Sequence, residues 1–498
     1  MGDDKIQEKG PSDVPSTAHL LLPETDLSHG IVGWEGQSDP RHPRNFSPAA
    51  KWIFMSLVSC MIVLSFLASS IVAPAAPHID TELHNDSDIL SSLVTTIYVL
   101  GFMVGPLILS PLSEVYGRLA IIHPANAFFT ATHIGVALAP GIGRLLAFRA
   151  LSGLGASACL SIGGGLTADL FDIHDRGLAT ALLTLGSLFG PVFGPIFGGI
   201  ITQRAGWRWN FWVMAIACAA VSLTMAVFAR ETHAEVIIRR KTLGLQKSLR
   251  SPGLQSAYEA GKGRKAPKTA KAQLSQGLVR PWQMLLRSPL LPITCLPVGF
   301  ISGLLYILLT TTSEFFQEVY GWSLEAAGLA YLGLGGGSAI GFVFFATTSD
   351  LITVRLTKKN SNTYTPEMRL VTSFLPALFI PISFFWYGWS TYEGNHWIVP
   401  ILSLAPFGFA QFGMNASFQA YMVDASGAYA ASAMACVSSV RCLFGAFVPL
   451  AGPSLYANLG LNWGNSLLGF VSLAMVPLPV LMYRFGQRLR EIHPLDTP

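Results

Sequence analysis

The residues best suited to chemistry in this sequence are charged groups inside or beside long apolar segments. Glu114 and Arg118 stand four residues apart in a short polar connection, with Gly117 between them. A carboxylate and a guanidinium at this spacing form a charge-assisted pair or reach the ends of neighbouring helices, and Gly117 permits a tight reversal of the chain. Such a clamp on one side of a membrane would hold one conformation closed there. The alternative is a solvated loop.

Two arginines lie within apolar segments. Arg149 is about six residues into its segment and Arg441 about eleven residues into another, near its middle. An arginine at the centre of a membrane helix costs about 2.5–3.5 kcal/mol on insertion scales, so a partner or water must compensate it. Arg149 would lie about 9 Å from the edge, where snorkelling is the alternative to a coupling role. For Arg441 we expect a wet cavity or a partner, and a structural ion pair is the alternative.

A third feature is a run of glycines and prolines in one apolar segment. Glycine recurs at every fourth position, which makes a stripe without side chains where a neighbouring helix packs at close backbone range. Two prolines remove amide donors and bend the helix, which suits a pivot. Ordinary small-residue packing is the alternative. The residues concerned are Gly186, Gly190, Pro191, Gly194, Pro195, Gly198 and Gly199.

Polar side chains in two later segments are candidates for a substrate cavity. Gln411, Asn415 and Gln419 share one helical face, with Phe412 beside them. Amides with one aromatic ring suit a bulky, mostly neutral organic solute, although amides that bond to adjacent helices are an equal alternative. Tyr306 is a weaker candidate on another segment.

Composition requires these segments to lie in a membrane. Of 498 residues, 51% are hydrophobic and 12% are charged, whereas soluble proteins carry about 25% charged residues. The net charge of +4 is too small to indicate nucleic acid. We predict twelve transmembrane helices, and therefore an all-α integral membrane protein with two six-helix bundles. The spans are at about 52–73, 89–110, 119–140, 145–168, 177–201, 207–229, 289–312, 326–348, 370–390, 397–420, 430–452 and 463–483.

The distribution of Lys and Arg predicts the orientation. Of the 32 basic residues, 27 fall on the side of the N-terminus and three on the other side, which places both termini in the cytosol. The expected parts are a largely disordered tail (1–50), a first bundle (51–229), a basic linker (230–288), a second bundle (289–484) and a C-terminal tail (485–498). The linker shows no apolar periodicity and is expected to be helical only near its start. Asn85, in an outside loop, begins an N-x-S glycosylation triplet.

The two halves of the sequence look related. An offset of 255 residues places Asp169 on Asp424, and an offset of 236 residues places Ser113 and Glu114 on Ser349 and Asp350. These matches fall at equivalent positions of the predicted topology. They indicate parallel six-helix repeats, in which a substrate site lies near the midplane between the halves.

Sequence motifs of catalysis are lacking. The chain contains no G-x-x-x-x-G-K-[ST] phosphate loop, no H-E-x-x-H and no G-x-S-x-G. Its six cysteines have no C-x-x-C spacing. We therefore expect no enzyme activity, no metal and no cofactor, and an ion gradient rather than ATP as the source of energy.

Several motifs resemble the major facilitator superfamily, in the form of fungal drug:proton antiporters with twelve spans. The resemblance implies that Arg149 begins a motif tied to proton coupling, that the helix with Gly190 is the antiporter motif, and that Asp169 and Asp424 belong to the gating loops. Leu119, where many members have a basic residue, and Glu314, where an apolar residue is expected, depart from the pattern. The matching segments are 39–46, 105–118, 168–171, 206–209, 231–232 with 239–241, 366–370, 421–424 and 463–470.

The predicted function is proton-coupled export of a small organic compound, such as a drug, toxin or secondary metabolite, by alternating access. The proton carrier is Glu314, Asp169 or a carboxylate that the sequence does not identify. We expect a monomer in the plasma membrane, with a vacuolar or vesicle membrane as the alternative. The alternative functions are an uptake symporter or facilitator of the same fold, and a non-transporting receptor or scaffold.

Overall fold

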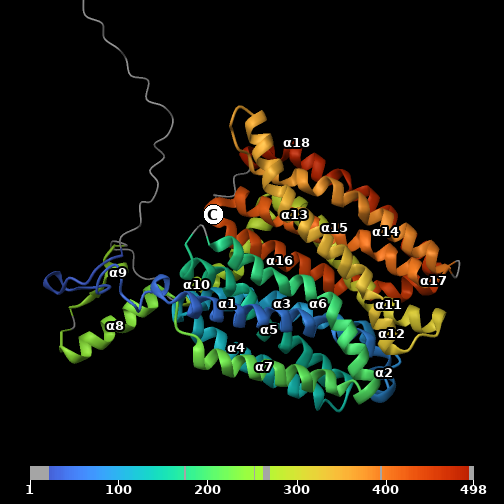
Figure 1. The fold of residues 1–498 in the computed structure, drawn as a ribbon, viewed down its shortest axis with the longest axis horizontal. Coiled ribbons are helices and arrows are strands. Elements are labelled where there is room, and N and C mark those ends of the chain that lie inside the picture. Colours follow the sequence, from blue (N-terminus) through green and yellow to red (C-terminus); the bar gives the residue numbers. More distant parts are fainter. Residues whose placement is uncertain (1–21, 173–174, 252, 262–269, 393–394, 493–498) are drawn as a thin grey trace, which may run out of the picture. The chain divides into compact units, whose positions relative to one another are not determined.

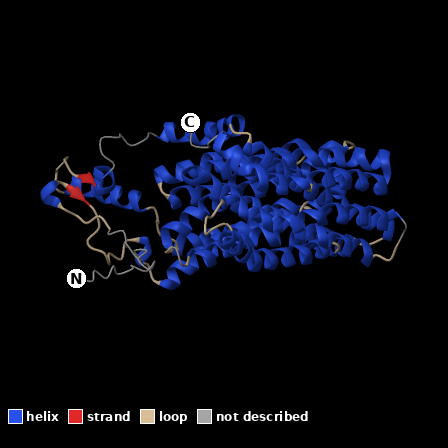
Figure 2. Cartoon of the chain, turned by 90° about the horizontal axis from the view of Figure 1, so that it is seen from above, coloured by secondary structure: helices blue, strands red, loops and turns tan. Residues whose placement is uncertain are grey.

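The computed structural model describes residues 22–172, 175–251, 253–261, 270–392 and 395–492. Almost all of this chain is helical, and its two strands are only two residues long (Figure 2). Ten helical stretches are long and apolar enough to cross a membrane. The described structure forms two compact units, residues 47–231 with 268–498, and residues 1–46 with 232–267.

The first half of the larger unit contains the six predicted membrane helices. They begin and end within a few residues of the predicted limits, because long apolar runs leave little choice of helix position in lipid. Their bounds are α1 Pro48–Ser70, α3 Asp88–Tyr116, α4 Arg118–Ala137, α5 Ile142–Leu170, α6 Arg176–Ala205 and α7 Arg208–Phe228. A short 3-10 turn, η3 Ala73–Ala75, and α2 Ala76–Leu83 connect α1 to α3.

The second half repeats this arrangement beside the first (Figure 1). Its elements are α11 Leu290–Tyr320, α12 Leu324–Leu329, α13 Tyr331–Lys359, η4 Pro366–Ser373, α14 Phe374–Tyr392, α15 Ile398–Ser426, η5 Gly427–Tyr429, α16 Ala430–Phe447, η6 Val448–Ala451, α17 Gly452–Met475 and α18 Pro477–Ile492. The twelve predicted spans thus each correspond to a helix. The number of apolar stretches is ten and not twelve because α4 is not among them and residues 432–492 are counted as one stretch.

The last predicted span has different limits in the structure. α17 begins eleven residues before the predicted start at 463 and changes direction at Gly460, whose φ of 71° is outside the helical region. The helix then ends at Met475, and α18 follows. Pro477 and Pro479 explain this end, because proline cannot donate the amide hydrogen bond that a continuous helix needs.

The smaller unit joins the N-terminal tail to the first part of the linker. It contains η1 Leu27–His29, β1 Ile31–Val32, η2 Pro43–Asn45, α8 Ala234–Ser248, β2 Gln255–Ser256 and α9 Ala257–Gly261. β1 pairs in parallel with β2, and the buried Trp34 donates from Nε1 to the Tyr258 hydroxyl at 3.0 Å. Lys241 lies 3.3 Å from Glu35. α8 is the helix expected near the start of the linker.

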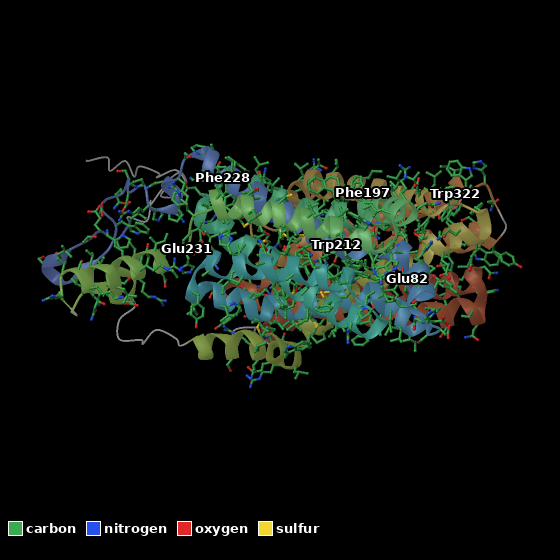
Figure 3. All side chains as sticks on the ribbon, turned by 90° about the horizontal axis from the view of Figure 1, so that it is seen from below. Glu82, Phe197, Trp212, Phe228, Glu231 and Trp322 are labelled. Carbon is green, nitrogen blue, oxygen red and sulfur yellow. The ribbon has the colours of Figure 1, made fainter. Side chains whose placement is uncertain are left out.

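The linker also contains a helix that the sequence analysis did not predict, α10 Ala270–Arg287. It packs on α3 of the first half and on α16 of the second half. Gly277 lies against Pro111 and Leu107 of α3, and the Arg280 guanidinium lies 4.1 Å from the centre of the Tyr429 ring. α10 therefore connects the two halves at the end of the bundle where α3 ends and α16 begins. We call this the linker end, and it contains Glu231; the far end contains Glu82 and Trp322 (Figure 3).

Candidate functional site

A polar cluster at the linker end holds three helices of the first half together. Arg118, at the start of α4, is buried and donates from Nε to Asp169 at 3.2 Å and from Nη1 to Ser113 at 2.9 Å. Asp169 stands near the end of α5 and Ser113 near the end of α3. Glu231, after α7, accepts hydrogen bonds from the backbone N–H groups of Arg118 and Leu119 at 2.8 and 3.3 Å. A carboxylate at a helix N-terminus satisfies free amides and the helix dipole.

The predicted pair of Glu114 and Arg118 is replaced by this cluster. Glu114 is exposed, and within the described residues it has no hydrogen bond or ion pair. Gly117 has a φ of 107°, and a Cβ there would lie 2.5 Å from Glu231 Oε2. The reversal at Gly117 thus brings the backbone close enough for Glu231 to cap α4. Arg118 bridges to neighbouring helix ends, which was the second of the two roles considered for it.

The second half contains an equivalent cluster built around Arg369. Its guanidinium lies 3.0 Å from Asp424, at the end of α15, and 2.6 Å from Asp350, in α13, and it donates to Ser349 at 3.4 Å. The Tyr364 hydroxyl also donates to Asp424. Burial, together with this hydrogen bond to a carboxylate, raises the pKa of Tyr364 to about 12.

The two clusters match two of the pairings that the sequence offsets indicated, whereas Glu114 and Asp350 differ, since only Asp350 pairs with an arginine among the described residues. Asp169 and Asp424 each accept from an arginine at the linker end, and Ser113 and Ser349 each lie beside the same arginine. The candidate residues did not include Arg369. An offset of 251 residues, which places Arg118 on Arg369, was the signal that would have found it.

Arg149 is completely buried and therefore does not snorkel. Its guanidinium donates to four backbone carbonyls where α1 and α3 meet α5, and its Cζ lies 4.9 Å from the centre of the Tyr98 ring and 5.8 Å from that of Phe211. The acceptors are Ala68, Ser69, Val94 and Thr95, at 2.8 to 3.4 Å. Carbonyl dipoles and aromatic faces thus compensate the charge, and no described carboxylate pairs with it.

The glycine stripe of α6 lies against α1. A Cβ at Gly186 would lie 2.6 Å from Ile62 Cγ2, and one at Gly190 would overlap Phe66. Further along, Gly194 faces the Ser70 hydroxyl and Gly198 the Ile71 carbonyl, and the Ser70 hydroxyl donates to Gly190 O at 2.8 Å. The stripe therefore brings two helices of the same half to backbone distance.

Another face of α6 contacts the second half. Gly199 faces the carbonyl of Leu324, at 2.5 Å from a Cβ built on the glycine, and Gly328 faces the carbonyl of Pro195. Arg204 lies 2.6 Å from Glu325 in α12 at the far end. Pro191 precedes Val192, which a Cβ on Gly335 of α13 would meet at 2.5 Å. α6 consequently packs on both halves at once, on α1 through its glycine stripe and on α12 and α13 through this second face.

A small pocket lies between the halves in the middle of the bundle, with a volume of about 30 Å³. α1, α3, α11 and α16 contribute its walls, and two predicted residues, Tyr306 and Arg441, line it. The other lining residues are Ser65, Phe66, Ser69, Tyr98, Val99, Phe102, Ser302 and Cys442.

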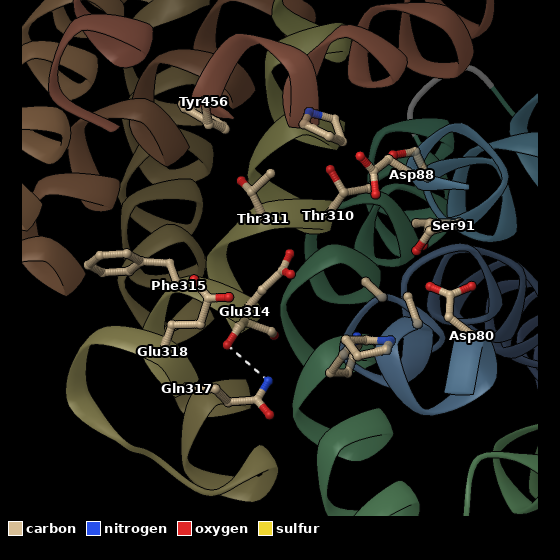
Figure 4. A pocket seen from close by; sticks show the side chains of 18 of the residues that line it. Asp80, Asp88, Ser91, Thr310, Thr311, Glu314, Phe315, Gln317, Glu318 and Tyr456 are labelled. Carbon is tan, nitrogen blue, oxygen red and sulfur yellow. Dashed lines mark hydrogen bonds between the residues drawn. The ribbon is translucent and has the colours of Figure 1, made fainter. Parts of the chain in front are cut away.

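A larger cavity of about 550 Å³ opens at the far end, and we call it the vestibule (Figure 4). It lies farther along the same two helices as the central pocket, with lining residues about one helical turn away. On α3 the lining passes from Tyr98 to Thr95 and Ser91, and on α11 from Tyr306 to Thr310 and Glu314. Five carboxylates line it, those of Asp80, Asp86, Asp88, Glu314 and Glu318, and the described lining has no Lys or Arg.

Two candidates from the sequence lie in the vestibule. Glu314 is exposed to it, and no described residue forms a hydrogen bond or ion pair with its carboxylate. Asn85 is half-buried there and donates from its side-chain amide to Asp80 at 2.7 Å and to Ser87 O at 3.2 Å. The amide nitrogen that glycosylation would modify is therefore held within the protein.

The four candidates on α15 lie away from both cavities. Gln411, Phe412, Asn415 and Gln419 are half-buried, and none is among the residues that line the central pocket or the vestibule. Asn415 donates to Gln411 O at 2.7 Å, and the Phe412 ring packs at 5.5 Å on Phe342 of α13. Asn415 therefore bonds within α15, and the contact with α13 is made by the Phe412 ring rather than by the amides.

Comparisons with known proteins agree with this architecture. The family model of the Major Facilitator Superfamily matches residues 58–449. The chain is 41% identical to the MFS transporter cpaT of Aspergillus oryzae, over 92% of this chain and 91% of that protein. It is 44% identical to the MFS transporter prlG of a fungal species, over 94% and 97%, and 42% identical to the MFS-type transporter penM of Penicillium rubens, over 95% and 93%.

Solved structures show the same fold at low sequence identity. The xylose transporter XylE from E. coli matches with a TM-score of 0.62 and 16% identity, over 88% of this chain and 98% of that one. A peptide transporter POT matches with a TM-score of 0.64 and 13% identity, over 90% and 98%. The present chain has two six-helix halves with the central pocket between them, and it is similar to these fungal transporters over most of its length. We conclude that this multi-pass membrane protein belongs to the Major Facilitator Superfamily of transporters.

Proposed function

We propose that the protein exports a small organic compound in exchange for protons, by alternating access of its two halves around the central pocket. The observation that carries this proposal is a pocket between the halves together with a larger cavity farther along the same two helices, α3 and α11. At about 550 Å³ the vestibule is within the range of drug-sized ligand sites. Helix α10 covers the opposite end of the seam between α3 and α16.

The elements that touch both halves support a rocking movement. α6 contacts the second half at Leu324 and Gly328, and α10 contacts both halves at the linker end. The clusters around Arg118 and Arg369 each lie within one half. They would therefore move as rigid parts, while the contacts of α6 and α10 change. A solute that binds both states equally would shift no equilibrium, so the proton must stabilise one state more than the other.

Glu314 is the carboxylate best placed to carry that proton. It lies in the vestibule within reach of water and has no described cation beside it. A carboxylate of this kind exchanges its proton without breaking an ion pair. Asp169, the other candidate, is committed to Arg118, so its protonation would first have to break a partly buried charge-assisted bond.

Proteoliposomes with an imposed pH gradient test the proposal. The probes are rhodamine 6G, fluorescein and Nile red, which are cationic, anionic and neutral. Exchange for protons fills acid-inside vesicles with dye, whereas cotransport fills acid-outside vesicles, and a facilitator responds to neither gradient. Because protein orientation does not change these signs, mixed insertion is acceptable. Protein-free vesicles correct for passive distribution, and a receptor or scaffold would move no dye.

The variant Glu314→Gln tests the assigned carrier. We expect dye to equilibrate across the membrane but not to accumulate with the gradient, because an amide cannot take up a proton. Glu318→Gln, one turn away on the same vestibule wall, is the matched control and should still accumulate dye. Accumulation by E314Q at the wild-type level would exclude Glu314 as the carrier.

A further inference from the structure

The two arginines between the membrane helices are compensated very differently. Arg149 is surrounded by four carbonyl acceptors and two aromatic rings. Arg441 is half-buried in α16, lines the central pocket, and no described residue accepts a hydrogen bond from its guanidinium or forms an ion pair with it. A guanidinium presents five N–H donors in a planar fork. In this conformation those of Arg441 point to no partner among the described residues.

The rest of the pocket is suited to an anion. Its lining contains five residues with hydroxyls and no carboxylate among the described residues. Ser302 is 7% exposed and its hydroxyl has no described hydrogen-bond partner. The Tyr98 ring, which also lines the pocket, has the Arg149 guanidinium 4.9 Å from its centre. A second positive charge therefore lies just behind the wall.

We infer that the central pocket binds the carboxylate group of an organic acid, with Arg441 as its counter-ion and Ser302 as a further donor. Its volume of about 30 Å³ is room for about two water molecules, and so for a charged head group but not for a whole metabolite. The body of the solute then extends along Thr95 and Thr310 into the vestibule. This inference rests on the proposed transport function and names its substrate class.

The acidic vestibule confines binding of the anionic group to the central pocket. An anion that leaves Arg441 toward the far end enters a cavity lined by five carboxylates and by no described Lys or Arg. Like charges repel it there, so attraction is confined to the pocket. The positive pocket binds the anion in the middle of the bundle. The negative vestibule does not retain it.

Binding of a matched pair of probes tests the inference without any transport. The probes are 2-naphthoate and the isosteric amide 2-naphthamide, and the readout is the thermal stability of the full-length protein in detergent at increasing probe concentration. We expect the wild type to bind naphthoate at least about tenfold more tightly than naphthamide, as a charge-assisted hydrogen-bonded pair implies. Arg441→Gln should remove this preference, and Arg441→Lys should keep part of it.

Arg144→Gln, which removes an exposed arginine on the first turn of α5, is the control and should bind both probes like the wild type. Equal binding of the two probes, no stabilisation by naphthoate up to millimolar concentration, or an unchanged preference in R441Q would overturn the anion site. These outcomes are independent of the vesicle assay. Gradient-driven movement of rhodamine 6G alone, with R441Q unaffected, would keep the proposed transport and refute the substrate class.

Discussion

The contact between α6 and α1 allows a quantitative test with a matched pair of substitutions. Gly190 lies on the stripe, and a Cβ there would overlap Phe66 Cβ and lie 2.7 Å from its carbonyl carbon and 3.0 Å from Leu67 N. The overlapped atoms belong to the α1 backbone or are attached to it directly, so no side-chain rotation relieves the clash. Gly164, exposed in α5, has no atom within 4 Å of such a Cβ.

The magnitude follows from the difference between Gly190→Ala and Gly164→Ala. Both variants gain about 0.5–1 kcal/mol from the better helix propensity of alanine, and this gain cancels in the comparison. Only Gly190→Ala forces two helices apart, and overpacking of this kind costs about 1–3 kcal/mol. G190A should therefore be less stable than G164A by about that amount, a factor of about 5 to 150 in the ratio of folded to unfolded protein.

Unfolding by SDS in mixed micelles, followed by tryptophan fluorescence, measures this difference. We expect the SDS midpoint of unfolding to be highest for G164A, intermediate for the wild type and lowest for G190A. Phe66 also lines the central pocket, so displacement of α1 should reduce dye accumulation in vesicles as well. Equal midpoints for the two variants would show that α6 and α1 are not packed at backbone distance, and the argument for close packing would then fail.

Two further predictions concern the clusters at the linker end. Arg118→Gln should destabilise the protein by about 1–3 kcal/mol in the same SDS assay, because it leaves Asp169 without its charge-assisted partner; a wild-type midpoint would show that the pair contributes nothing. Tyr364→Phe should alter the response to alkaline pH. The pKa of Tyr364 is raised from 10.0 to about 12, so its contribution is complete below pH 10 and is lost as the pH rises through 12. The wild type should lose thermal stability relative to Y364F over that interval, and parallel curves would contradict the assignment.

The sequence predicted the membrane helices well because their signal is local. Apolar runs long enough to cross lipid determine where each helix must lie, and eleven of the twelve spans each correspond mainly to one helix, although α13 extends eleven residues past its predicted end. The exception, predicted at 463–483, shows the limit of hydropathy, since it does not register the turn at Gly460 or the end before Pro477. Helix α10 was missed for a related reason. Its residues have no apolar run, and their packing on α3 and α16 stabilises the helix.

The candidate site was predictable in its residues and much less so in its contacts. Charged residues in apolar segments stand out in any sequence, and Arg149 and Arg441 were found in this way, whereas Glu314 was found as a departure from the family pattern. The partners of these residues come from segments distant in the chain. Asp169 and not Glu114 accepts from Arg118, and backbone carbonyls, which carry no sequence signal, surround Arg149. The α15 amides share a helical face as predicted, but that face is not on a cavity.

By itself, the sequence determined that this chain crosses a membrane with two related six-helix halves, because lipid requires every backbone amide to be satisfied within a helix and so ties the fold to the apolar pattern. Only the tertiary structure decided which charges are compensated. That depends on distances between helices that approach one another across the bundle, and it is why Arg149 is enclosed by carbonyls while Arg441 faces a pocket with its donors free.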